Sequence, residues 1–536
     1  MQDAQQTDYA IQSRLVMALM ESMRNQAATG RVRLLETHIS WVLLCGHYAY
    51  KIKKSIALGF LDFSSLQARR YYCEEELRLN RRLAPRLYLN VISIGGSPEA
   101  PVLGEQPAQE YAVRMRRFAT SKQLDRLVAN NKIVAQQIDS LAATIAHFHG
   151  NLPAAALDSP FGTAKAIRAD AEQNFEQLQG LLVEQTDIEI LAALRLANDV
   201  EYATCHSLFG QRRVQGFVRE CHGDLHLGNI VVIDGKPTPF DGIEFNPALR
   251  WIDIMSEIAF TMMDLLHHQR IDLAWRFLNA WLEVTGDYSG IPLLRFYIAY
   301  RAMVRAKVCA IRASQTGLSQ HESTESWANC RGYLALAADC YARKRAALIF
   351  THGLPGSGKT TFSQIASERL QAIRLRSDVE RKRLVGLAPL AHSQASIGVD
   401  LYATDITRRT YARLHELARA LLSAGYRVIV DAAFLQQEER DHFSQLAHEL
   451  SVPFAIVSIQ ARQETLRVRI LQRHNAANDA SEADIAVLEK LQMSQQPLSP
   501  GERKHAVDFE NEGADLTLDN PGWGSLDELL NRFISA

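Results

Sequence analysis

The pattern of apolar and polar residues changes near residue 344 and predicts two domains, 1–344 and 345–536. In the first domain, apolar positions recur every three or four residues over long stretches, which is typical of helices. Shorter runs of alternating apolar and polar residues predict strands between them. The helical stretches are 8–28, 64–84, 134–150 and 165–210, and the strands lie within 40–54 and 110–118. Together they predict an α+β domain.

After residue 344, apolar runs of strand length alternate with helical patterns. The runs read AALIF, QAIRLRS, YRVIVDAAF, PFAIVSIQ and ADLTLDN. Strands that alternate with helices form a parallel sheet covered by helices on both faces. The second domain is therefore expected to be an α/β domain with a doubly wound parallel sheet.

The composition is that of a globular chain, with 47% hydrophobic and 22% charged residues, and its 536 residues fit about three domains or two large ones. The net charge of -1 gives no general field for nucleic acid or an anionic membrane, so neither partner is expected. The seven cysteines are odd in number and widely spaced, which favours reduced thiols over disulfides or a zinc cluster. No signal-peptide pattern opens the chain, and no apolar run approaches the roughly 18–20 residues of a membrane span. These features predict a cytoplasmic protein.

A glycine-rich segment, GLPGSGKTT, satisfies G-x-x-x-x-G-K-[ST] and lies between a predicted strand and a predicted helix. In such a loop, backbone N–H groups and the helix N-terminus bind phosphates, so a chance turn is the weaker interpretation. Lys359 is expected to bridge the β- and γ-phosphates of ATP, and the Thr360 hydroxyl to ligate Mg²⁺. The expected nucleotide-binding residues are Gly353, Leu354, Pro355, Gly356, Ser357, Gly358, Lys359, Thr360 and Thr361.

Two aspartates and a pair of arginines in the second half are further candidates for the same phosphate-binding site. Asp431 follows a strand pattern and is suited to hold Mg²⁺ or its water, while Asp378 could accept a proton from a substrate hydroxyl. The alternative for each aspartate is to cap the next helix. Arg469 and Arg473 are four residues apart on a predicted helix and could close over transferring phosphates. Their alternative is an ordinary solvated surface.

A second phosphate-handling pattern lies in the first domain, within CHGDLHLGNIVVIDGKPTPFDGIEF. Asp224 and Asn229 have the spacing of the protein-kinase catalytic loop, H-x-D-x-x-x-x-N. Asp224 would reach the acceptor hydroxyl while Asn229 ligates Mg²⁺. A turn signal at Asp234 predicts a hairpin that returns the chain to Asp241, the second expected metal ligand. A metal cluster of His222, Asp224 and His226 and a purely structural polar loop are the alternatives.

The kinase interpretation requires a lysine on a strand and a glutamate on the helix that follows. HYAYKIKKS offers Lys51 and Lys53, which face the same side of a strand, and we choose Lys51. CEEEL offers Glu74, Glu75 and Glu76, and we favour Glu76 for its place on the apolar face. Exposed strand lysines are the alternative. The strand within 110–118 would lead into a hinge that meets adenine, and Met115 is expected there.

The first half, from about Leu34 to Phe260, resembles the aminoglycoside-phosphotransferase-like branch of the kinase superfamily in HGDLHLGN, FDGIEF, AYKIKK and CEEEL. The resemblance implies a kinase-like bilobal domain, with an N-lobe of about 1–118 and a C-lobe of about 119–344. It makes Asp224 the catalytic base and Asn229 and Asp241 the Mg²⁺ ligands. It also makes Asp253 an acid that braces the loop. The segment 36–40, which would cover the nucleotide, lacks glycines, and Glu244 is either a further ligand or support for one.

The second half resembles the small P-loop kinases of the zeta-toxin, gluconate-kinase and chloramphenicol-phosphotransferase type in GLPGSGKTT, RSDVERKRL, VIVDAAF and RILQRHNAANDASEAD. The resemblance implies a P-loop NTPase fold and transfer of the γ-phosphate of ATP to a small-molecule hydroxyl. It makes Asp378 the base and Arg469 and Arg473 lid residues. The fusion of both halves in one chain resembles a bacterial family of fused phosphotransferase and ATP-binding proteins.

The leading hypothesis is a bifunctional, ATP- and Mg²⁺-dependent phosphotransferase with a small-molecule hydroxyl acceptor. In one alternative, one half is a nucleotide-sensing or regulatory module that controls the other. In another, the second half is a zeta-toxin-like kinase restrained by its fused partner. The stretches expected to contact the acceptor, 285–330 and 385–400, have no transferable code, so the sequence does not name it. It gives no oligomeric state either.

Overall fold

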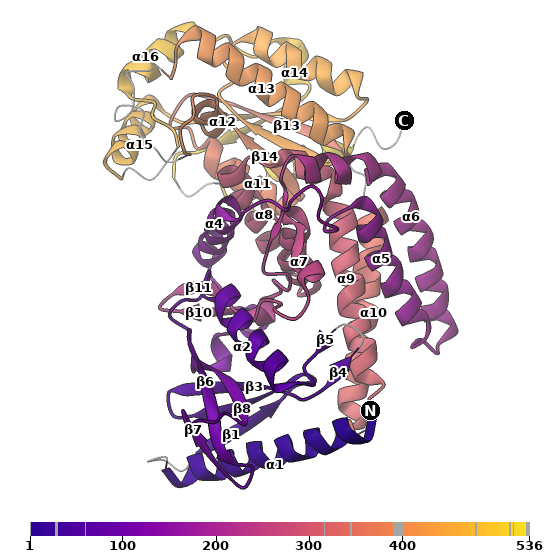
Figure 1. The fold of residues 1–536 in the computed structure, drawn as a ribbon. Helices are drawn as coiled ribbons and strands as arrows, with labels where there is room; N and C mark the ends of the chain where they lie inside the picture. The colour runs from indigo at the N-terminus through magenta and orange to yellow at the C-terminus, as the bar shows by residue number, and fades with distance from the viewer. Residues whose placement is uncertain are drawn as a thin grey trace. The chain divides into compact units, whose positions relative to one another are not determined.

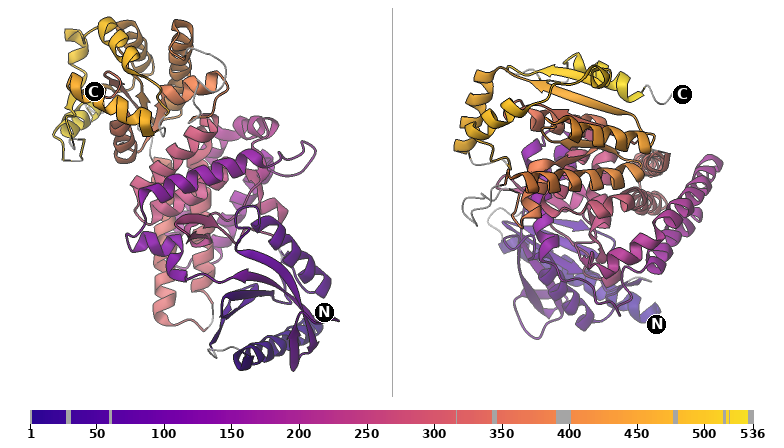
Figure 2. Two further views of the ribbon diagram at one scale, coloured as in Figure 1. Left: turned by 90° about the vertical axis from the view of Figure 1, so that its left-hand side faces the viewer. Right: turned by 90° about the horizontal axis from the view of Figure 1, so that it is seen from above.

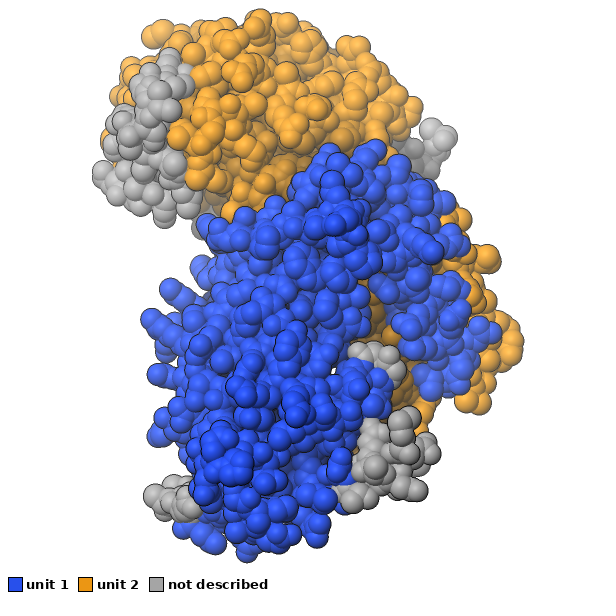
Figure 3. All heavy atoms as spheres, in the orientation of Figure 1, with its two compact units in different colours: residues 1–181, 202–264 blue, residues 182–201, 265–536 orange. Residues whose placement is uncertain are grey.

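The computed structural model describes residues 2–26, 31–58, 61–315, 317–342, 346–389, 401–476, 480–513, 516–517 and 519–531. The chain forms two compact units (Figure 3). The first comprises 1–181 and 202–264, and the second comprises 182–201 and 265–536. The second unit runs across residue 344, so the boundary between 1–344 and 345–536 stays a prediction.

The first unit contains a six-stranded sheet with the order β1-β2-β3-β8-β6-β7, antiparallel throughout (Figure 1). Its strands are β1 (Val32–Glu36), β2 (Ser40–Cys45), β3 (Tyr48–Lys53), β6 (Tyr88–Ser97), β7 (Ala100–Leu103) and β8 (Glu110–Arg116). Helix α1 (Gln2–Gln26) packs on the face that carries Ile52 and Ala112. Helix α2 (Leu66–Asn80) packs on the opposite face, beside Val113. Because side chains alternate along a strand, Lys51 and Lys53 of β3 face α2.

The rest of the first unit is mainly helical and carries two short strand pairs. Hairpin β10 (Ile230–Ile233) and β11 (Lys236–Pro239) follows the catalytic-loop pattern, and β9 (Val218–Glu220) pairs with β12 (Trp251–Asp253). Strands β4 (Ala57–Leu58) and β5 (Leu61–Asp62) form a further small pair. The helices of this region are α3 (Leu124–Ala129), α4 (Ala135–Asn151), α5 (Ala164–Gln179), the second part of α6 (Gln185–Val214) and most of α7 (Ile254–His267). Residues 185–201 of α6 and 265–267 of α7 belong to the second unit.

Besides the first part of α6, the second unit contains the helices α8 (Ile271–Thr285), α9 (Ile291–Ala313) and α10 (Gln320–Ala342), of which α9 and α10 run side by side (Figure 1, Figure 2). They lead into a parallel sheet with the order β14-β15-β13-β16-β17. The strands are β13 (Ala347–His352), β14 (Ala372–Arg376), β15 (Arg427–Asp431), β16 (Phe454–Gln460) and β17 (Ala506–Glu510).

Helices cover both faces of this parallel sheet. On one face, Ile349 packs with α11 (Lys359–Leu370) and α18 (Gly522–Asn531). On the other, Phe350 contacts Phe443 of α14 (Gln437–Glu449). The remaining helices are α12 (Ser377–Leu384), α13 (Thr404–Ser423), α15 (Gln463–Ala476), α16 (Ile485–Ser494) and α17 (Pro500–Arg503).

The predicted fold class is confirmed: an α+β part with an antiparallel sheet precedes an α/β part with a doubly wound parallel sheet. The prediction of the fifth parallel strand at ADLTLDN is wrong, because the strand is β17 and the described residues of 514–520 carry none. Strand β17 lies at the edge of the sheet and alternates buried Val507 and Phe509 with exposed polar residues, so its apolar signal is weak. Within the described ranges, no helix has the length and apolar content needed to cross a membrane.

Candidate functional site

The glycine-rich loop connects β13 to α11 in the second unit. Gly353, Gly356 and Gly358 have φ values of 153°, 83° and 102°, a backbone region that favours glycine. A Cβ atom on Gly358 would lie 2.1 Å from Nδ2 of Asn511, so this position has no room for a side chain. Lys359 Nζ donates to the carbonyl oxygen of Leu354 over 2.9 Å. The loop therefore curls around its own lysine at the start of α11, as a phosphate-binding loop requires.

Asp431 ends strand β15 beside this loop and is buried, with 5% of its surface exposed. Its Oδ2 accepts a hydrogen bond from Ser363 Oγ of α11 over 2.8 Å. Among the described residues, none donates a hydrogen bond to Oδ1. Thr360, on the first turn of α11, brings its hydroxyl to the same cavity. A carboxylate and a hydroxyl are hard oxygen ligands, so these residues fit Mg²⁺.

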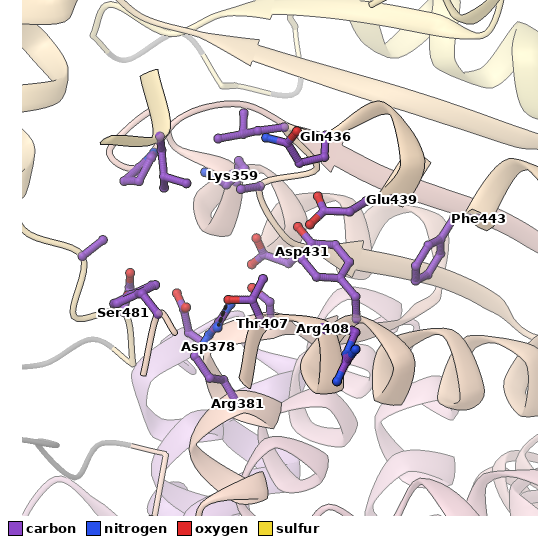
Figure 4. A pocket seen from close by; sticks show the side chains of 18 of the residues that line it. Lys359, Asp378, Arg381, Thr407, Arg408, Asp431, Gln436, Glu439, Phe443 and Ser481 are labelled. Atoms are coloured by element: carbon purple, nitrogen blue, oxygen red, sulfur yellow. Dashed lines mark hydrogen bonds between the residues drawn. The ribbon is translucent and has the colours of Figure 1, made fainter. Parts of the chain in front are cut away.

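A cavity of about 1120 Å³ opens at the loop and is lined by Lys359, Asp378, Asp431 and Arg469. Figure 4 shows the side chains of Lys359, Asp378 and Asp431 converging on it. Asp378 is the second residue of α12, whose cap position is Arg376, so Asp378 does not cap that helix. The structure therefore brings together the loop and both aspartates that the sequence singles out.

Arg469 of α15 lies over the loop, with Nη1 3.3 Å from the carbonyl oxygen of Gly356 and Nη2 3.3 Å from Oδ1 of Asn511. The side chain of Arg473 lies outside the described residues. Asn511 also donates from Nδ2 to the carbonyl oxygen of Ser357 over 2.7 Å. Asn511 thus supports both the loop and Arg469. Its role could not be predicted from the sequence, because a single asparagine after an edge strand carries no pattern.

Arg381 is a second residue that the sequence analysis missed. It lies three residues after Asp378 on α12, lines the same cavity and is 6% exposed. It donates to the carbonyl oxygen of Leu401 over 2.9 Å and to Thr407 Oγ1 over 3.0 Å (Figure 4). Its Nε has no hydrogen-bond partner, and no carboxylate among the described residues lies within ion-pair distance. Arg381 is therefore a buried cation whose hydrogen bonds go to neutral oxygens, and its guanidinium lies 5.1 Å from the centre of the Tyr402 ring.

In the first unit, the carboxylate of Glu76 forms ion pairs with both candidate lysines. Lys51 Nζ lies 2.9 Å from Oε1 of Glu76, and Lys53 Nζ lies 2.6 Å from Oε2. Glu74 instead pairs with Arg70 at the surface, and Glu75 pairs with Arg78 and Arg250. Burial raises the pKa of Glu76, but the two ammonium groups outweigh burial and lower that pKa to about 2. Glu76 therefore joins α2 to β3 through ion pairs with both lysines.

Two further carboxylates complete this charge cluster. Asp241 Oδ1 lies 2.5 Å from Lys51 Nζ, and Glu244 pairs with Lys53. Asp241 has a φ of 64°, and its N–H donates to the hydroxyl of Tyr88 over 3.0 Å. Burial raises the pKa of Glu244. Glu244 therefore binds a lysine within the cluster, and Asp241 lies between Lys51 and solvent, with 43% of its side chain exposed.

The catalytic-loop pattern places Asn229 against Asp224. Asn229 Nδ2 donates to Oδ2 of Asp224 over 2.9 Å and to its carbonyl oxygen over 3.1 Å. The Asp224 side chain is 34% exposed and is therefore accessible from solvent. Glu257 accepts the N–H of His222 over 2.8 Å, and Asp264 accepts the N–H of Leu227 over 2.8 Å. These two buried acids hold the loop.

The expectation that Asp253 braces this loop is wrong. Its carboxylate binds Arg212 over 2.7 and 2.8 Å and accepts the N–H of Met255 over 2.8 Å. Arg212 is fully buried and needs a charged partner there, which explains the arrangement. Glu257 and Asp264 accept hydrogen bonds from the loop instead. Both lie on α7, beyond the residues that the H-x-D-x-x-x-x-N pattern covers.

Three further residues that the sequence singles out in the first unit are His222, His226 and Met115. His222 Nε2 lies 2.9 Å from the carbonyl oxygen of Phe240, and His226 Nδ1 accepts the N–H of Gly228 over 3.1 Å. His222 thus uses both ring nitrogens in backbone hydrogen bonds, which does not favour the metal cluster that the sequence leaves open. Nε2 of His226 lies 3.5 Å from Oδ2 of Asp224. Met115 is partly buried in β8 and packs in a cluster that includes Phe240 and Tyr88.

The comparisons with known proteins concern both parts of the chain. Residues 348–498 match a family model described as an AAA domain, which confirms the prediction of a P-loop domain there. An uncharacterized protein of Mycobacterium tuberculosis H37Rv is 28% identical over 455 residues, covering 84% of this chain and 88% of that protein. Because 455 residues exceed either predicted half, this similarity extends over both.

Two solved structures are similar to different parts of the chain. Amicoumacin kinase in complex with AMP-PNP, Ca²⁺ and Ami is 12% identical, with a TM-score of 0.38, and the match covers 58% of this chain and 89% of that one. The APS kinase CysC of Mycobacterium tuberculosis in complex with AMPPNP and APS is 18% identical, with a TM-score of 0.25. That match covers 36% of this chain and 99% of the kinase.

Proposed function

We propose that the chain is an ATP- and Mg²⁺-dependent phosphotransferase that transfers the γ-phosphate of ATP to a hydroxyl group of a small molecule. It has one catalytic site in each predicted half, 1–344 and 345–536. The observation that carries the proposal is the cavity in which Lys359, Asp378 and Asp431 meet. A phosphate-binding lysine, a carboxylate for the metal and a carboxylate for the acceptor are the groups that phosphoryl transfer needs.

In the P-loop site, each group has a distinct task. The loop N–H groups and Lys359 bind the β- and γ-phosphates, and Thr360 and Asp431 hold Mg²⁺. Bound Mg²⁺ neutralises charge on the phosphate oxygens. Asp378 accepts the proton of the acceptor hydroxyl, and Arg469 contributes positive charge above the loop.

The acceptor of the P-loop site carries an anionic group, such as a carboxylate or a phosphate. Arg381 supports this, because a buried guanidinium with neutral partners leaves its positive charge available to a ligand. Its position three residues after Asp378 puts the charge and the proton acceptor on one side of α12. An acceptor held by Arg381 would therefore present its hydroxyl near Asp378.

In the first site, Asp224 accepts the proton of its acceptor, while Asn229 and Asp241 hold Mg²⁺. The amide of Asn229 fixes the Asp224 carboxylate through the 2.9 Å hydrogen bond. Lys51 binds the phosphates of ATP while Glu76 holds it in place. Because Lys51 is also bonded to Asp241, nucleotide binding requires Lys51 to exchange that bond for a phosphate.

A second candidate function is regulatory, and this same bond favours it. If Lys51 keeps its bond to Asp241 when nucleotide is present, the first site binds nucleotide without transferring phosphate. The first site would then control the P-loop site. The two functions differ in the effect of Asp224, since only a catalytic first site loses a product when that carboxylate is removed.

The test measures ATP turnover and the mass of phosphorylated products with a pooled panel of sugars, nucleosides, polyols, aminoglycosides and their anionic derivatives. Asp224→Asn and Lys359→Ala are each expected to lose a different product. Asp234→Asn, in the exposed β10–β11 turn, and Lys504→Ala, at the surface, are the matched controls and should keep both products. If turnover depends on Lys359 and not on Asp224, the regulatory function holds for the first site. If neither variant loses a product, the proposal is wrong.

A further inference from the structure

Helix α8 closes the exposed edge of the parallel sheet. Strand β14 is the first strand in the sheet order, so one of its sides has no neighbouring strand among the described residues. The side-chain amide of Asn279 donates to the carbonyl oxygen of Ala372 over 2.9 Å and accepts the N–H of Arg374 over 2.7 Å. Asn279 thus binds both kinds of backbone group that the edge of β14 offers.

Glu283 lies one turn after Asn279 on α8 and binds two arginines of the same strand. Its Oε2 lies 3.1 Å from Nη1 of Arg376, and its Oε1 pairs with Nη2 of Arg374. The three side chains are 14%, 13% and 5% exposed, in the order Glu283, Arg376 and Arg374. Burial raises the pKa of Glu283, but the two guanidinium groups outweigh burial and lower it. Glu283 is therefore ionised and holds both arginines.

Arg374 and Arg376 each also lie near a candidate Mg²⁺ ligand of the P-loop site. Arg374 Nη1 lies 3.5 Å from the carbonyl oxygen of Thr360. Arg376 Nε lies 3.9 Å from Oδ2 of Asp431, its partner in the register of β14 and β15. Ser363 donates to the same Oδ2, which leaves Oδ1 of Asp431 for the metal or its water.

In this cluster both guanidinium groups contact the carboxylate of Glu283, and Arg376 also lies near the carboxylate of Asp431. Removal of the Glu283 charge takes away the carboxylate that the two arginines share. Arg376 would then be drawn toward Asp431 and would compete with a metal for its oxygens. Glu283 is therefore expected to affect metal binding through the two arginines and not as a metal ligand.

We infer that Glu283 is a positioning residue of the P-loop site, which acts through Arg374 and Arg376 to keep Thr360 and Asp431 arranged for Mg²⁺ and nucleotide. The inference rests on the proposed function of that site. Helix α8 precedes residue 344, so the site depends on a residue outside its own predicted domain.

The test uses the full chain and measures binding of a fluorescent, non-hydrolysable ATP analogue while Mg²⁺ is varied. Only the component of binding that Lys359→Ala abolishes is analysed, since the first half also has a candidate nucleotide site. Glu283→Gln is expected to raise the Mg²⁺ concentration for half-maximal binding by about 10-fold or more. Binding of the analogue without Mg²⁺ should stay within about twofold of the wild type.

Glu368→Gln is the matched control, because Glu368 pairs with Arg276 of α8 over 2.9 Å and contacts neither arginine of β14. It should leave the Mg²⁺ requirement unchanged. Glu283→Asp should restore part of the wild-type requirement. In the double variant Glu283→Gln with Arg376→Gln, the shift should be smaller than in Glu283→Gln, because the competing cation is gone.

Equal changes in Tm and in Mg²⁺ requirement for Glu283→Gln and Glu368→Gln would overturn the inference and leave Glu283 as an ordinary interface residue. If the wild type binds the analogue through Lys359 but transfers no phosphate, the proposed function is wrong, while the Mg²⁺ shift still decides the role of Glu283. If no binding depends on Lys359, both the proposed function of the site and this inference are wrong.

Discussion

Lys53 and Glu244 form an ion pair in the first unit that is almost closed to solvent, with side chains 0% and 3% exposed. Lys53 also holds Glu76, the carboxylate it shares with Lys51. The two lysines differ in their outer partners, because Asp241, beside Lys51, has 43% of its side chain exposed. The difference predicts separate roles for two residues that the sequence does not distinguish.

Lys53→Met is expected to destabilise the protein by about 3–5 kcal/mol, because it leaves Glu244 buried without its cation. Lys51→Met should reduce stability less, since water can solvate Asp241, and it should abolish the product of the first site. Urea unfolding and the product assay check the two effects. Lys236→Met is the control, with an expected change below about 1 kcal/mol, because Lys236 is exposed on β11. Equal losses of stability in Lys51→Met and Lys53→Met would contradict the assignment.

The acid sensitivity of the first unit should depend on Glu76. Its pKa in the folded protein is about 2, below its ordinary value of 4.5, because Lys51 and Lys53 outweigh the effect of burial. The stabilisation is therefore complete above about pH 4.5 and is lost as the pH falls toward 2. It amounts to about 3 kcal/mol over that range. Unfolding in urea between pH 6 and pH 2.5 should show a shallower pH dependence in Glu76→Gln, whereas Glu74→Gln, at the surface, should follow the wild type.

Arg381 should determine the affinity of the P-loop site for its acceptor. Arg381→Gln is expected to raise the KM for an anionic acceptor by about 10- to 100-fold, because a hydrogen bond to a charged group is lost. The KM for ATP should stay within about threefold. Initial rates with the acceptor found in the panel provide both constants. Arg503→Gln is the control, since Arg503 is 48% exposed and pairs with Asp508 outside the cavity. A neutral acceptor with unchanged KM in Arg381→Gln would refute the role.

The sequence predicted those parts of the site that depend on local backbone. The loop 353–361 and the spacing from Asp224 to Asn229 are continuous in the chain, and their chemistry follows from residue types at fixed intervals. The strands that carry Lys51 and Asp431 were predicted because buried strands have a strong apolar pattern.

The residues that the sequence did not predict act across the fold. Asn511 and Glu283 reach the loop region from segments far away in the chain, and no spacing relates them to it. Asp253 was given the wrong partner because the sequence does not show that Arg212 is buried beside it. Arg381 was missed although its i,i+3 relation to Asp378 was visible, because only the fold shows that its partners are neutral.

The dependence of the P-loop site on α8 predicts how an isolated second half behaves. A fragment of residues 345–536 lacks Asn279 and Glu283, so the edge of β14 is open and Arg374 and Arg376 lose their carboxylate. Exposed strand edges promote aggregation, and the fragment lacks the hydrogen bonds and ion pairs that join α8 to β14. We therefore expect less soluble protein from this fragment than from residues 265–536, which retain α8, and weaker binding of nucleotide with Mg²⁺.

The same fragment separates this view from a zeta-toxin-like kinase restrained by the first half. A restrained toxin is released by the truncation, so cells that express residues 345–536 should stop growing. Dependence on α8 predicts that these cells grow normally, because the fragment loses the support of Thr360 and Asp431. Expression with Lys359→Ala in the fragment is the control for toxicity that is unrelated to the loop. Growth arrest by the fragment, abolished by Lys359→Ala, would show that the P-loop site works without Glu283.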